Sequence, residues 1–432
     1  MPLRLDAAAP GFDAAFRAFL NARRDPDADV SAAVRDIIAR VRSEGDAAVR
    51  DLTLRFDRIN LAKTGMAFTP AEIDGAAAKV EPATLRALEH AAERIATFHA
   101  RHKPANDSFT DADGVQLGAR WSPISAAGLY VPGGKAAYPS SVLMNAIPAK
   151  VAGVPRIAMV VPVPDGVVNP LILAAAKLAG VTEIYRIGGA QAVAALAFGT
   201  ATIAPVDKIT GPGNAYVAEA KRQVFGTVGI DMIAGPSEIL VVADAQNDPA
   251  WIAADLLSQA EHDEAAQAIL ITDDAAFGDA VARAVDTHLA TLGRTTIAAQ
   301  SWKDWGAIIT VKALADAAPL VDALAPEHLE LAVADPDALS ARISNAGAIF
   351  MGRHTPEAIG DYVAGPNHVL PTARSARFSS GLSVLDFMKR TTLVRCSPEG
   401  LSAIGPSAIA LADAEGLGAH ALSVAIRLNR RS

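Results

Sequence analysis

Residues 258–263 (SQAEHD) combine an amide, an imidazole and carboxylates at the end of an apolar segment, residues 251–257. If that segment is a helix, Gln259 and His262 lie three residues apart on one face. An amide oxygen and an imidazole nitrogen can both bind a metal ion, so these two side chains are candidate metal ligands. Taken alone, the stretch is more typical of a polar helix end with solvated charges. The metal interpretation therefore needs partners elsewhere in the chain.

Histidines near carboxylates recur downstream, again at the ends of apolar segments. Glu327 and His328 are adjacent where a predicted helix meets a predicted strand, and such a pair can share proton transfers. A helix-terminal glutamate beside a surface histidine explains that dipeptide equally well. Asp361 precedes His368 after a predicted strand at 348–351. Its carboxylate is a candidate third metal ligand, although a loop or N-cap aspartate is common.

Near the C-terminus, Glu415 and His420 are five residues apart, so a continuous helix would not present them on one face. The glycines between them allow a bend. A terminal pair of this kind is more often solvated than functional, unless it is delivered to another site. The single cysteine, Cys396, has no histidine nearby in the sequence and is interpreted as structural.

Three glycine-rich turns each follow a predicted strand and precede a predicted helix: 132–135 (PGGK), 188–191 (GGAQ) and 211–214 (GPGN). Glycine lets the backbone approach a ligand, and the N–H groups at a helix N-terminus favour phosphate. Together the turns suggest a nucleotide crevice at the carboxyl ends of parallel strands. Ordinary strand-to-helix turn chemistry explains any one of them, and a G-x-G-x-x-G fingerprint is absent.

Composition limits the class of protein. A chain of 432 residues with 51% hydrophobic residues is expected to form two or more domains. The net charge of −8 argues against nucleic acid or an anionic membrane as the main partner. One cysteine excludes an intrachain disulfide and a cysteine-cluster metal site. The N-terminus lacks the apolar region of a signal peptide, and no apolar run would cross a bilayer, so we expect a cytoplasmic protein.

The hydrophobic pattern predicts an α/β fold. The first hundred residues are predicted mostly as helix, and 106–121 as a loop or hairpin. From residue 128 onward, short apolar strands alternate with helices, which is typical of βαβ units with buried parallel strands. Two α/β units are expected. The tail from about residue 378 is predicted to be extended and then briefly helical, as an appendage that packs elsewhere, for example on a partner subunit.

Seven longer motifs give the chain a resemblance to the histidinol dehydrogenase family over nearly its whole length, from about Val30. They occur in this order: GLYVPGG (128–134), GPGN (211–214), DMIAGPSE (231–238), SQAEH (258–262), PEHL (326–329), GPNHVLPT (365–372) and EGL with a following histidine (415–420). The resemblance implies a zinc-dependent, NAD-linked, four-electron oxidation of L-histidinol to L-histidine through an aldehyde-level intermediate. These are the last two steps of histidine biosynthesis.

The resemblance also implies roles for individual residues. Four implied zinc ligands, for one Zn²⁺ per active site, are Gln259, His262, Asp361 and His420. The implied proton-handling pair is Glu327 and His328. Implied substrate contacts are Ser237, Gln259, His262, His328, Asp361, Glu415 and His420. Implied NAD contacts are Tyr130, Gln191 and Asn214. Glu261 and His368 receive no role.

By the same resemblance, the fold comprises two Rossmann-like α/β domains with parallel sheets, in an intertwined homodimer. The expected division is an N-terminal helical extension at 1–30, a first α/β domain at 31–127 with 238–377, a second at 128–237, and a C-terminal extension at 378–432. The first domain is expected to carry the metal and catalytic residues, and the second the NAD contacts. Glu415 and His420 are expected to reach the active site of the partner subunit.

A mechanism follows as a hypothesis. His328 takes the alcohol proton during the first oxidation, Glu327 activates water toward the aldehyde, and His328 assists the second oxidation. A thioester is unnecessary, in keeping with the position of Cys396. Three rivals are a relative that oxidises another polar alcohol, such as a sulfonated diol, a zinc hydrolase, and a binding protein without activity. The motifs at the substrate end, the glycine turns and the complete ligand set argue against these rivals in turn.

Overall fold

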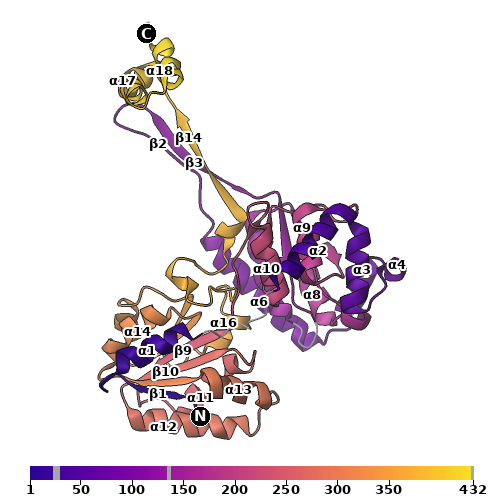
Figure 1. Cartoon of the computed structure of the whole chain (residues 1–432), viewed down its shortest axis with the longest axis vertical. Helices are drawn as coiled ribbons and strands as arrows, with labels where there is room; N and C mark the ends of the chain where they lie inside the picture. The colour runs from indigo at the N-terminus through magenta and orange to yellow at the C-terminus, as the bar shows by residue number, and fades with distance from the viewer. Residues whose placement is uncertain (23–29, 134–137, 430–432) are drawn as a thin grey trace.

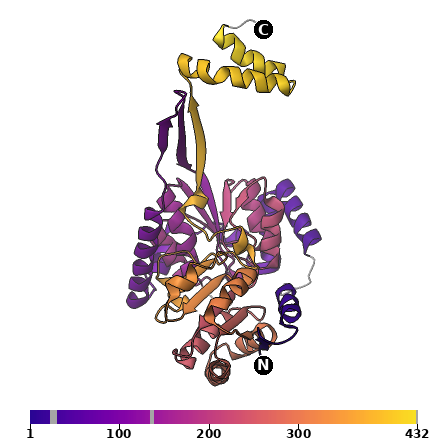
Figure 2. The same ribbon diagram turned by 90° about the vertical axis from the view of Figure 1, so that its left-hand side faces the viewer.

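In the computed structural model, which describes residues 1–22, 30–133 and 138–429, the chain forms two α/β lobes and a projecting arm (Figure 1). The lower lobe in Figure 1 is built on a six-stranded sheet, the upper lobe on a five-stranded sheet, and the arm on a three-stranded sheet. The N-terminus lies on the lower lobe, and the last helices of the described chain lie at the far end of the arm. Figure 2 shows from a second direction that the arm stands clear of both lobes.

The sheet of the lower lobe is parallel throughout, in the order β1-β11-β10-β9-β12-β13. Its strands are β1 (Leu3–Asp6), β9 (Glu238–Ala243), β10 (Gln267–Thr272), β11 (Ala307–Thr310), β12 (His328–Ala332) and β13 (Ala348–Met351). Its helices are α1 (Phe12–Asn21), α11 (Pro249–Ala260), α12 (Ala275–Leu289), α13 (Thr295–Trp305), α14 (Ala317–Leu324), α15 (Pro336–Ser340) and α16 (Glu357–Tyr362).

Both faces of this sheet are covered, which explains why its central strands are apolar at nearly every position. Ile239 and Val241 of β9 pack with α11, α12 and α13, whereas Leu240 and Val242 pack on the opposite face with α1 and α14. Successive residues of a strand point to opposite faces, so one short strand contributes to two cores. The sheet is therefore a rigid base for the residues at its edges.

The sheet of the upper lobe is also parallel, in the order β6-β5-β4-β7-β8. Its strands are β4 (Ala126–Tyr130), β5 (Arg156–Val160), β6 (Glu183–Tyr185), β7 (Lys208–Thr210) and β8 (Gly229–Ile230). The helices that alternate with them are α7 (Pro139–Ala152), α8 (Pro170–Ala179), α9 (Gly189–Phe198) and α10 (Ala215–Val224). The predicted α/β class with parallel sheets is confirmed.

The observed lobes differ from the expected division of the chain at its N-terminal end. Five helices that precede residue 102 pack on the upper lobe: α2 (Ser31–Glu44), α3 (Asp46–Asp57), α4 (Leu61–Thr64), α5 (Pro70–Ala77) and α6 (Pro82–Arg101). Val34 and Ile95 share one core with Leu129 and Ile184, so 31–101 does not group with 238–377. The apolar stripes of α2, α5 and α6 are buried there against the alanine-rich helices α7, α8 and α9. Residues 1–22, in turn, belong to the lower lobe, because β1 pairs with β11.

The arm joins two distant parts of the sequence. β3 (Gln116–Pro123) pairs antiparallel with β2 (Asp107–Thr110) on one side and with β14 (Met388–Arg395) on the other. Two helices, α17 (Pro398–Ala414) and α18 (Gly418–Ala425), pack on each other at its end. The predicted hairpin and extended tail are confirmed, but the tail carries more helix than expected. Cys396 is free and exposed beside β14.

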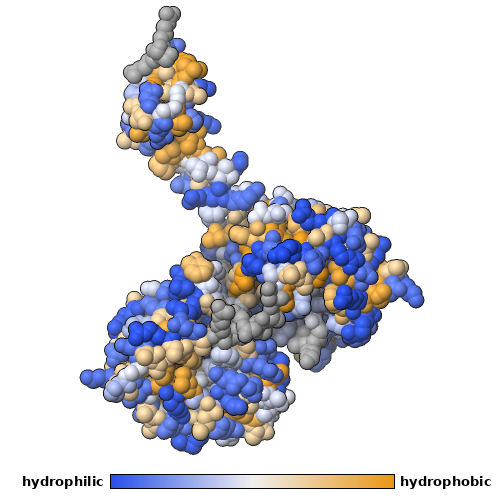
Figure 3. All heavy atoms as spheres, in the orientation of Figure 1, coloured by the Kyte–Doolittle hydropathy of each residue, from blue (hydrophilic) through white to orange (hydrophobic). Residues whose placement is uncertain are grey.

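The arm leaves apolar side chains on its surface, as the orange patches at its end in Figure 3 show. Exposed large apolar residues on the arm are Phe109, Leu393, Val394, Leu411, Leu417, Leu422 and Ile426. Such a set is unusual for an isolated surface and typical of one that another surface covers. Among the described residues, no helix is both long and apolar enough to cross a membrane.

Candidate active site

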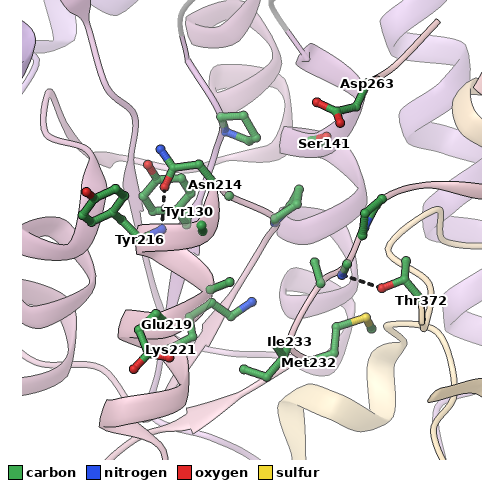
Figure 4. Close-up of a pocket in the computed structure, with 18 of the residues that line it drawn as sticks. Tyr130, Ser141, Asn214, Tyr216, Glu219, Lys221, Met232, Ile233, Asp263 and Thr372 are labelled. Atoms are coloured by element: carbon green, nitrogen blue, oxygen red, sulfur yellow. Dashed lines mark hydrogen bonds between the residues drawn. The ribbon is translucent and has the colours of Figure 1, made fainter. Parts of the chain in front are cut away.

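A cleft of about 1640 Å³ separates the two lobes and is lined by residues of both. It lies at the carboxyl ends of β4 and β7 in the upper lobe, where Tyr130 and the turn at 211–214 are found. In the lower lobe it lies at the amino ends of β9 and β12, where Ser237 and Glu327 are found. Figure 3 shows the hollow between the lobes, and Figure 4 shows part of its lining.

Glu327 and His328 are fixed at the start of β12 by the neighbouring strand β9. The backbone N–H of Glu238 donates to Oε2 of Glu327 (2.9 Å), and the N–H of Glu327 donates to Oε2 of Glu238 (3.3 Å). Nδ1 of His328 lies 2.9 Å from the carbonyl oxygen of Glu238. Because a carbonyl only accepts, Nδ1 carries the proton of the neutral ring, and Nε2 keeps its lone pair.

Burial sets the protonation of this pair. The loss of water around Glu327, reinforced by nearby carboxylates, raises its pKa well above the usual value. Burial also lowers the pKa of His328, so its ring is neutral near pH 7. The Nε2 atom of His328 is buried without a hydrogen-bond partner among the described residues. Burial therefore favours the neutral form of both side chains, and Nε2 of His328 is available to accept a proton.

Helix α16 brings two more carboxylates to His328. Its Nε2 lies 3.6 Å from Oε1 of Glu357 and 3.8 Å from Oδ1 of Asp361, and the three potential ligand atoms lie within 4.8 Å of one another. Burial, with the charge of Glu357 second, raises the pKa of Asp361 to about 8. The carboxylate of Glu330 accepts the N–H of Glu357, and Ser258 Oγ donates to Glu357 Oε2 at 3.0 Å. Sequence reasoning missed Glu357; its spacing of four from Asp361 was the available signal.

Gln259 and His262 enter the cleft from the end of α11. The helix ends at Ala260, so His262 lies in the following turn, with its N–H donating to the carbonyl of Gln259 at 3.0 Å. Gln259 is 1% exposed, and neither its amide oxygen nor its amide nitrogen has a partner among the described residues. Burial lowers the pKa of His262. A buried amide without a partner costs free energy, so a ligand is expected to satisfy it.

The expected nucleotide contacts line the opposite wall of the cleft. The Tyr130 hydroxyl accepts the N–H of Gly189 at 3.0 Å, and burial raises the pKa of Tyr130 to about 12. Gln191 is buried at the start of α9. Asn214 caps α10 and accepts from the N–H groups of Tyr216 and Val217 (Figure 4). Of the PGGK turn, the last two residues lie outside the described residues.

His368, for which no role was expected, bridges the lobes at this wall. Its Nδ1 lies 3.0 Å from the carbonyl oxygen of Asp361, and its Nε2 lies 3.3 Å from Oγ of Ser141 in α7. Burial lowers the pKa of His368 to about 4. The ring is therefore a neutral link between α16 and the upper lobe. Glu261 follows the end of α11 and does not line the cleft.

Two expected site residues are not in the cleft of their own chain. Glu415 follows the end of α17, and His420 lies in α18; both are exposed at the end of the arm. Figures 1 and 2 both show these helices far from the cleft between the lobes. The structure thus brings together Gln259, His262 and Asp361, but not His420.

A cleft between two doubly wound α/β lobes, lined by buried carboxylates, imidazoles and an unpartnered amide, is the site of an enzyme. The family model described as histidinol dehydrogenase matches residues 20–428. The histidinol dehydrogenase of Rhodospirillum rubrum is 69% identical, covering 100% of this chain and 99% of that protein. That of Rhizobium meliloti is 66% identical, covering 99% of each.

A solved structure gives the same result. The histidinol dehydrogenase of Elizabethkingia anophelis superposes with a TM-score of 0.95 at 36% identity, covering 99% of this chain and 98% of that one. The chain belongs to the histidinol dehydrogenase family, and it is an oxidoreductase.

The raised pKa of Asp361 predicts how pH acts on the metal-free protein. An unfolded aspartate loses its proton near pH 3.8, whereas folded Asp361 keeps it to about pH 8. Between these values the folded state binds the extra proton, so its stabilising effect is complete at low pH and is lost as pH rises. We expect Asp361 to lower the free energy of unfolding by urea, in chelator, from pH 5 to 8, by at most about 1.4 kcal/mol per pH unit. The buried histidines His262, His328 and His368, whose pKa values are lowered from 6.5, act in the opposite direction at the acidic end of this range.

Replacing Asp361→Asn should flatten that fall, while Asp273→Asn, at an exposed position of the same lobe, should leave it unchanged. Glu327 will maintain part of the slope in both variants, because its pKa is raised too. Equal slopes for wild type and Asp361→Asn would contradict the prediction.

Proposed function

We propose that this protein oxidises L-histidinol to L-histidine with NAD, through an aldehyde-level intermediate, at a zinc site in the cleft. The supporting observation is the set of buried polar atoms without partners among the described residues: the amide of Gln259, Nε2 of His328 and Oε1 of Glu357. All belong to elements that meet at the cleft of a chain from this family. Unsatisfied buried polar atoms are costly, and substrate with metal would supply their partners.

The donor set fits a cation. Gln259, His262 and Asp361 would hold zinc, with His420 of a second copy as the fourth ligand. Mixed oxygen and imidazole donors suit zinc, and buried carboxylates such as Glu357 add the negative charge that a cation needs. When bound, zinc would orient the substrate and stabilise charge on it. A cation would also lower the pKa of nearby carboxyl groups, including Asp361 and Glu327.

The upper lobe would hold the nucleotide. Tyr130, Gln191 and Asn214 come from three successive strand-to-helix connections at one edge of the sheet. That edge is where open α/β sheets bind nucleotides. NAD, when bound there, supplies the hydride acceptor for each of the two oxidations.

Proton handling falls to β12. With its Nδ1 hydrogen donated to the carbonyl of Glu238, neutral His328 accepts the alcohol proton at Nε2 as the carbon is oxidised. Glu327, ionised when the site holds a cation, takes a proton from water as the water oxygen adds to the aldehyde carbon. One of its oxygens already accepts from Glu238, so the other is left for water. As the water oxygen adds, His328 returns its proton to the carbonyl oxygen, which completes the hydrate. The neutral ring then accepts a proton from that hydrate during the second oxidation.

The arm would complete the site of a second copy. Glu415 and His420 are exposed, remote from their own cleft, and accompanied by exposed apolar side chains. A symmetric dimer in which each arm crosses to the other copy would bury that surface and supply the missing ligand. We therefore propose an intertwined homodimer with two shared active sites.

The direct test is to count NADH. Purified protein with limiting L-histidinol and excess NAD should form two NADH per histidinol and release L-histidine. Prior treatment with a chelator should abolish the reaction, and added Zn²⁺ should restore it. A protein that forms no NADH from histidinol would refute the proposal, and full activity in chelator would refute the metal site.

Replacing Glu327→Gln should separate the two oxidations. Without the carboxylate that activates water, oxidation of the aldehyde should fall by about 10² to 10⁴, whereas oxidation of the alcohol is retained better. Stopped-flow NADH formation from histidinol and from histidinaldehyde measures the two steps. Equal losses in both steps would show that Glu327 does not act on water.

Mixing two variants that each form little L-histidine tests the shared site. Glu327→Gln lies in the lower lobe and His420→Ala in the arm, so a crossed heterodimer contains one doubly altered site and one intact site. Co-refolding equal amounts of the two variants should restore about a quarter of the wild-type rate of L-histidine formation. Half of the dimers are then mixed, and each mixed dimer has one intact site. If each chain used its own arm, every site would carry one change and no activity would return.

A further inference from the structure

Lys221 and Asp231 form an ion pair in the upper lobe that is almost completely removed from water. Their side chains are 2% and 1% exposed, and Lys221 Nζ contacts Asp231 Oδ1 directly. Lys221 lies in α10, and Asp231 follows β8 at the start of the DMIAGPSE motif. The mechanism above uses neither residue. A pair of this kind rarely improves stability over apolar residues of the same size, so its retention calls for another role.

The pair holds Gly211 of the GPGN turn through both of that residue's backbone polar groups. Lys221 Nζ donates to the carbonyl of Gly211 at 3.0 Å, and the N–H of Gly211 donates to Asp231 Oδ2 at 2.7 Å. The φ of Gly211 is 109°, and a Cβ there would lie 2.0 Å from the carbonyl oxygen of Tyr130. The turn therefore packs closely against the end of β4, and the ion pair determines how far the turn lies from that strand.

The same turn begins the helix that Asn214 caps, so the pair fixes the start of α10 as well. Lys221 lies two turns further along that helix (Figure 4). Helix α10, the GPGN turn and the Lys221–Asp231 pair thus contact one another and together hold Asn214, the expected NAD contact. A shift of Gly211 would move Asn214 with it.

Asp231 continues this connection toward the lower lobe. Its Oδ1 accepts the N–H of Met232 at 2.7 Å, and three residues later the N–H of Gly235 donates to Thr372 Oγ1 at 2.6 Å (Figure 4). The segment then enters β9 at Glu238, whose backbone N–H holds Glu327. Residues 231–238 are therefore a short segment, held by hydrogen bonds, that connects the GPGN turn to Glu327 and His328.

We propose that the Lys221–Asp231 pair positions the nucleotide wall of the cleft against the substrate wall. Lys221 and Asp231 are positioning residues, because they act through the backbone N–H and carbonyl of Gly211 and do not contact the reacting atoms. This inference rests on the proposed use of NAD in the upper lobe. It predicts that loss of the pair weakens nucleotide binding and leaves histidinol binding nearly intact, since the histidinol contacts belong to the lower lobe and the arm.

Three variants separate positioning from stability. Lys221→Met keeps the apolar stem but leaves a buried carboxylate unpaired, and should lower the melting temperature most. Asp231→Asn keeps one oxygen acceptor for a backbone N–H and should be milder. The double variant Lys221→Met with Asp231→Asn is neutral, so much of the stability should return, but the carbonyl of Gly211 still lacks its charged donor. Arg156→Met with Glu183→Gln is the matched control, because that pair joins the starts of β5 and β6, at the sheet edge away from the cleft.

NADH binding to the full-length, zinc-loaded protein is measured by fluorescence titration, and histidinol binding by calorimetry. For the neutral double variant we expect the Kd of NADH to rise on the order of tenfold, as for a lost charge-assisted hydrogen bond, with the Kd of histidinol within about twofold of wild type. The Arg156–Glu183 control should lose melting temperature without losing NADH affinity.

Three results would overturn the proposal: NADH affinity that recovers together with stability in the double variant, unchanged NADH affinity in all variants, or parallel losses for NADH and histidinol. Should Lys221→Met fail to fold, the double variant and Asp231→Asn carry the test. Binding requires no turnover, so a wild type that binds NADH but does not oxidise histidinol would refute the proposed function and leave this test intact.

Discussion

Glu238 and Glu327 lie at the amino ends of neighbouring strands, and each carboxylate accepts the backbone N–H of the other residue. This reciprocal contact fixes β12 against β9 at the place where the cleft begins. It also brings His328 within reach of the Glu238 carbonyl, which determines the ring nitrogen that is left for chemistry. The raised pKa of Glu327 and the lowered pKa of His328 follow from the same buried junction. The remaining site residues are arranged around it.

The two sheets face the cleft with opposite polarity. The upper lobe follows the usual arrangement of open α/β sheets, with its turns at the carboxyl ends of the strands. The lower lobe presents the amino ends of its strands instead. At the carboxyl ends, the carboxylate of Asp244 accepts hydrogen bonds from Arg353, Asn247 and the N–H of Ala334. That ion-pair and hydrogen-bond network closes the edge where a ligand would otherwise be expected. One cleft therefore brings a wall of glycine-rich turns and a wall of ionisable side chains into opposition.

Much of this arrangement could be predicted from the sequence, because buried parallel strands are apolar at every position and alternate with helices. The spacing of Gln259 and His262 predicts that they share a face, and both line the cleft, although the helix ends before His262. Glu357 was not found, since its spacing of four from Asp361 was its only signal, and the fold is what brings it beside His328.

The N-terminal helices were assigned to the wrong lobe for a different reason. An amphipathic stripe shows that a helix is buried but not which surface buries it. α2 packs on α9 and α10, more than a hundred positions away, and α6 packs on α7 and α8. The arm is similar, because the pairing of β3 with β14 depends on two segments that the sequence separates widely. Periodicity reports local structure, whereas these contacts depend on chain topology.

The edge strand β1 has a consequence for how the molecule is made. Leu3 pairs with Ala307, so the first strand to leave the ribosome waits for one synthesised about three hundred residues later. The residues of the upper lobe are synthesised in between, and the other strands of the lower lobe follow them. The lower lobe must therefore close after synthesis is well advanced, and long-range parallel pairing of this kind forms slowly. Residues 231–238, which return the chain from the upper lobe to β9, then tie the two walls of the cleft together.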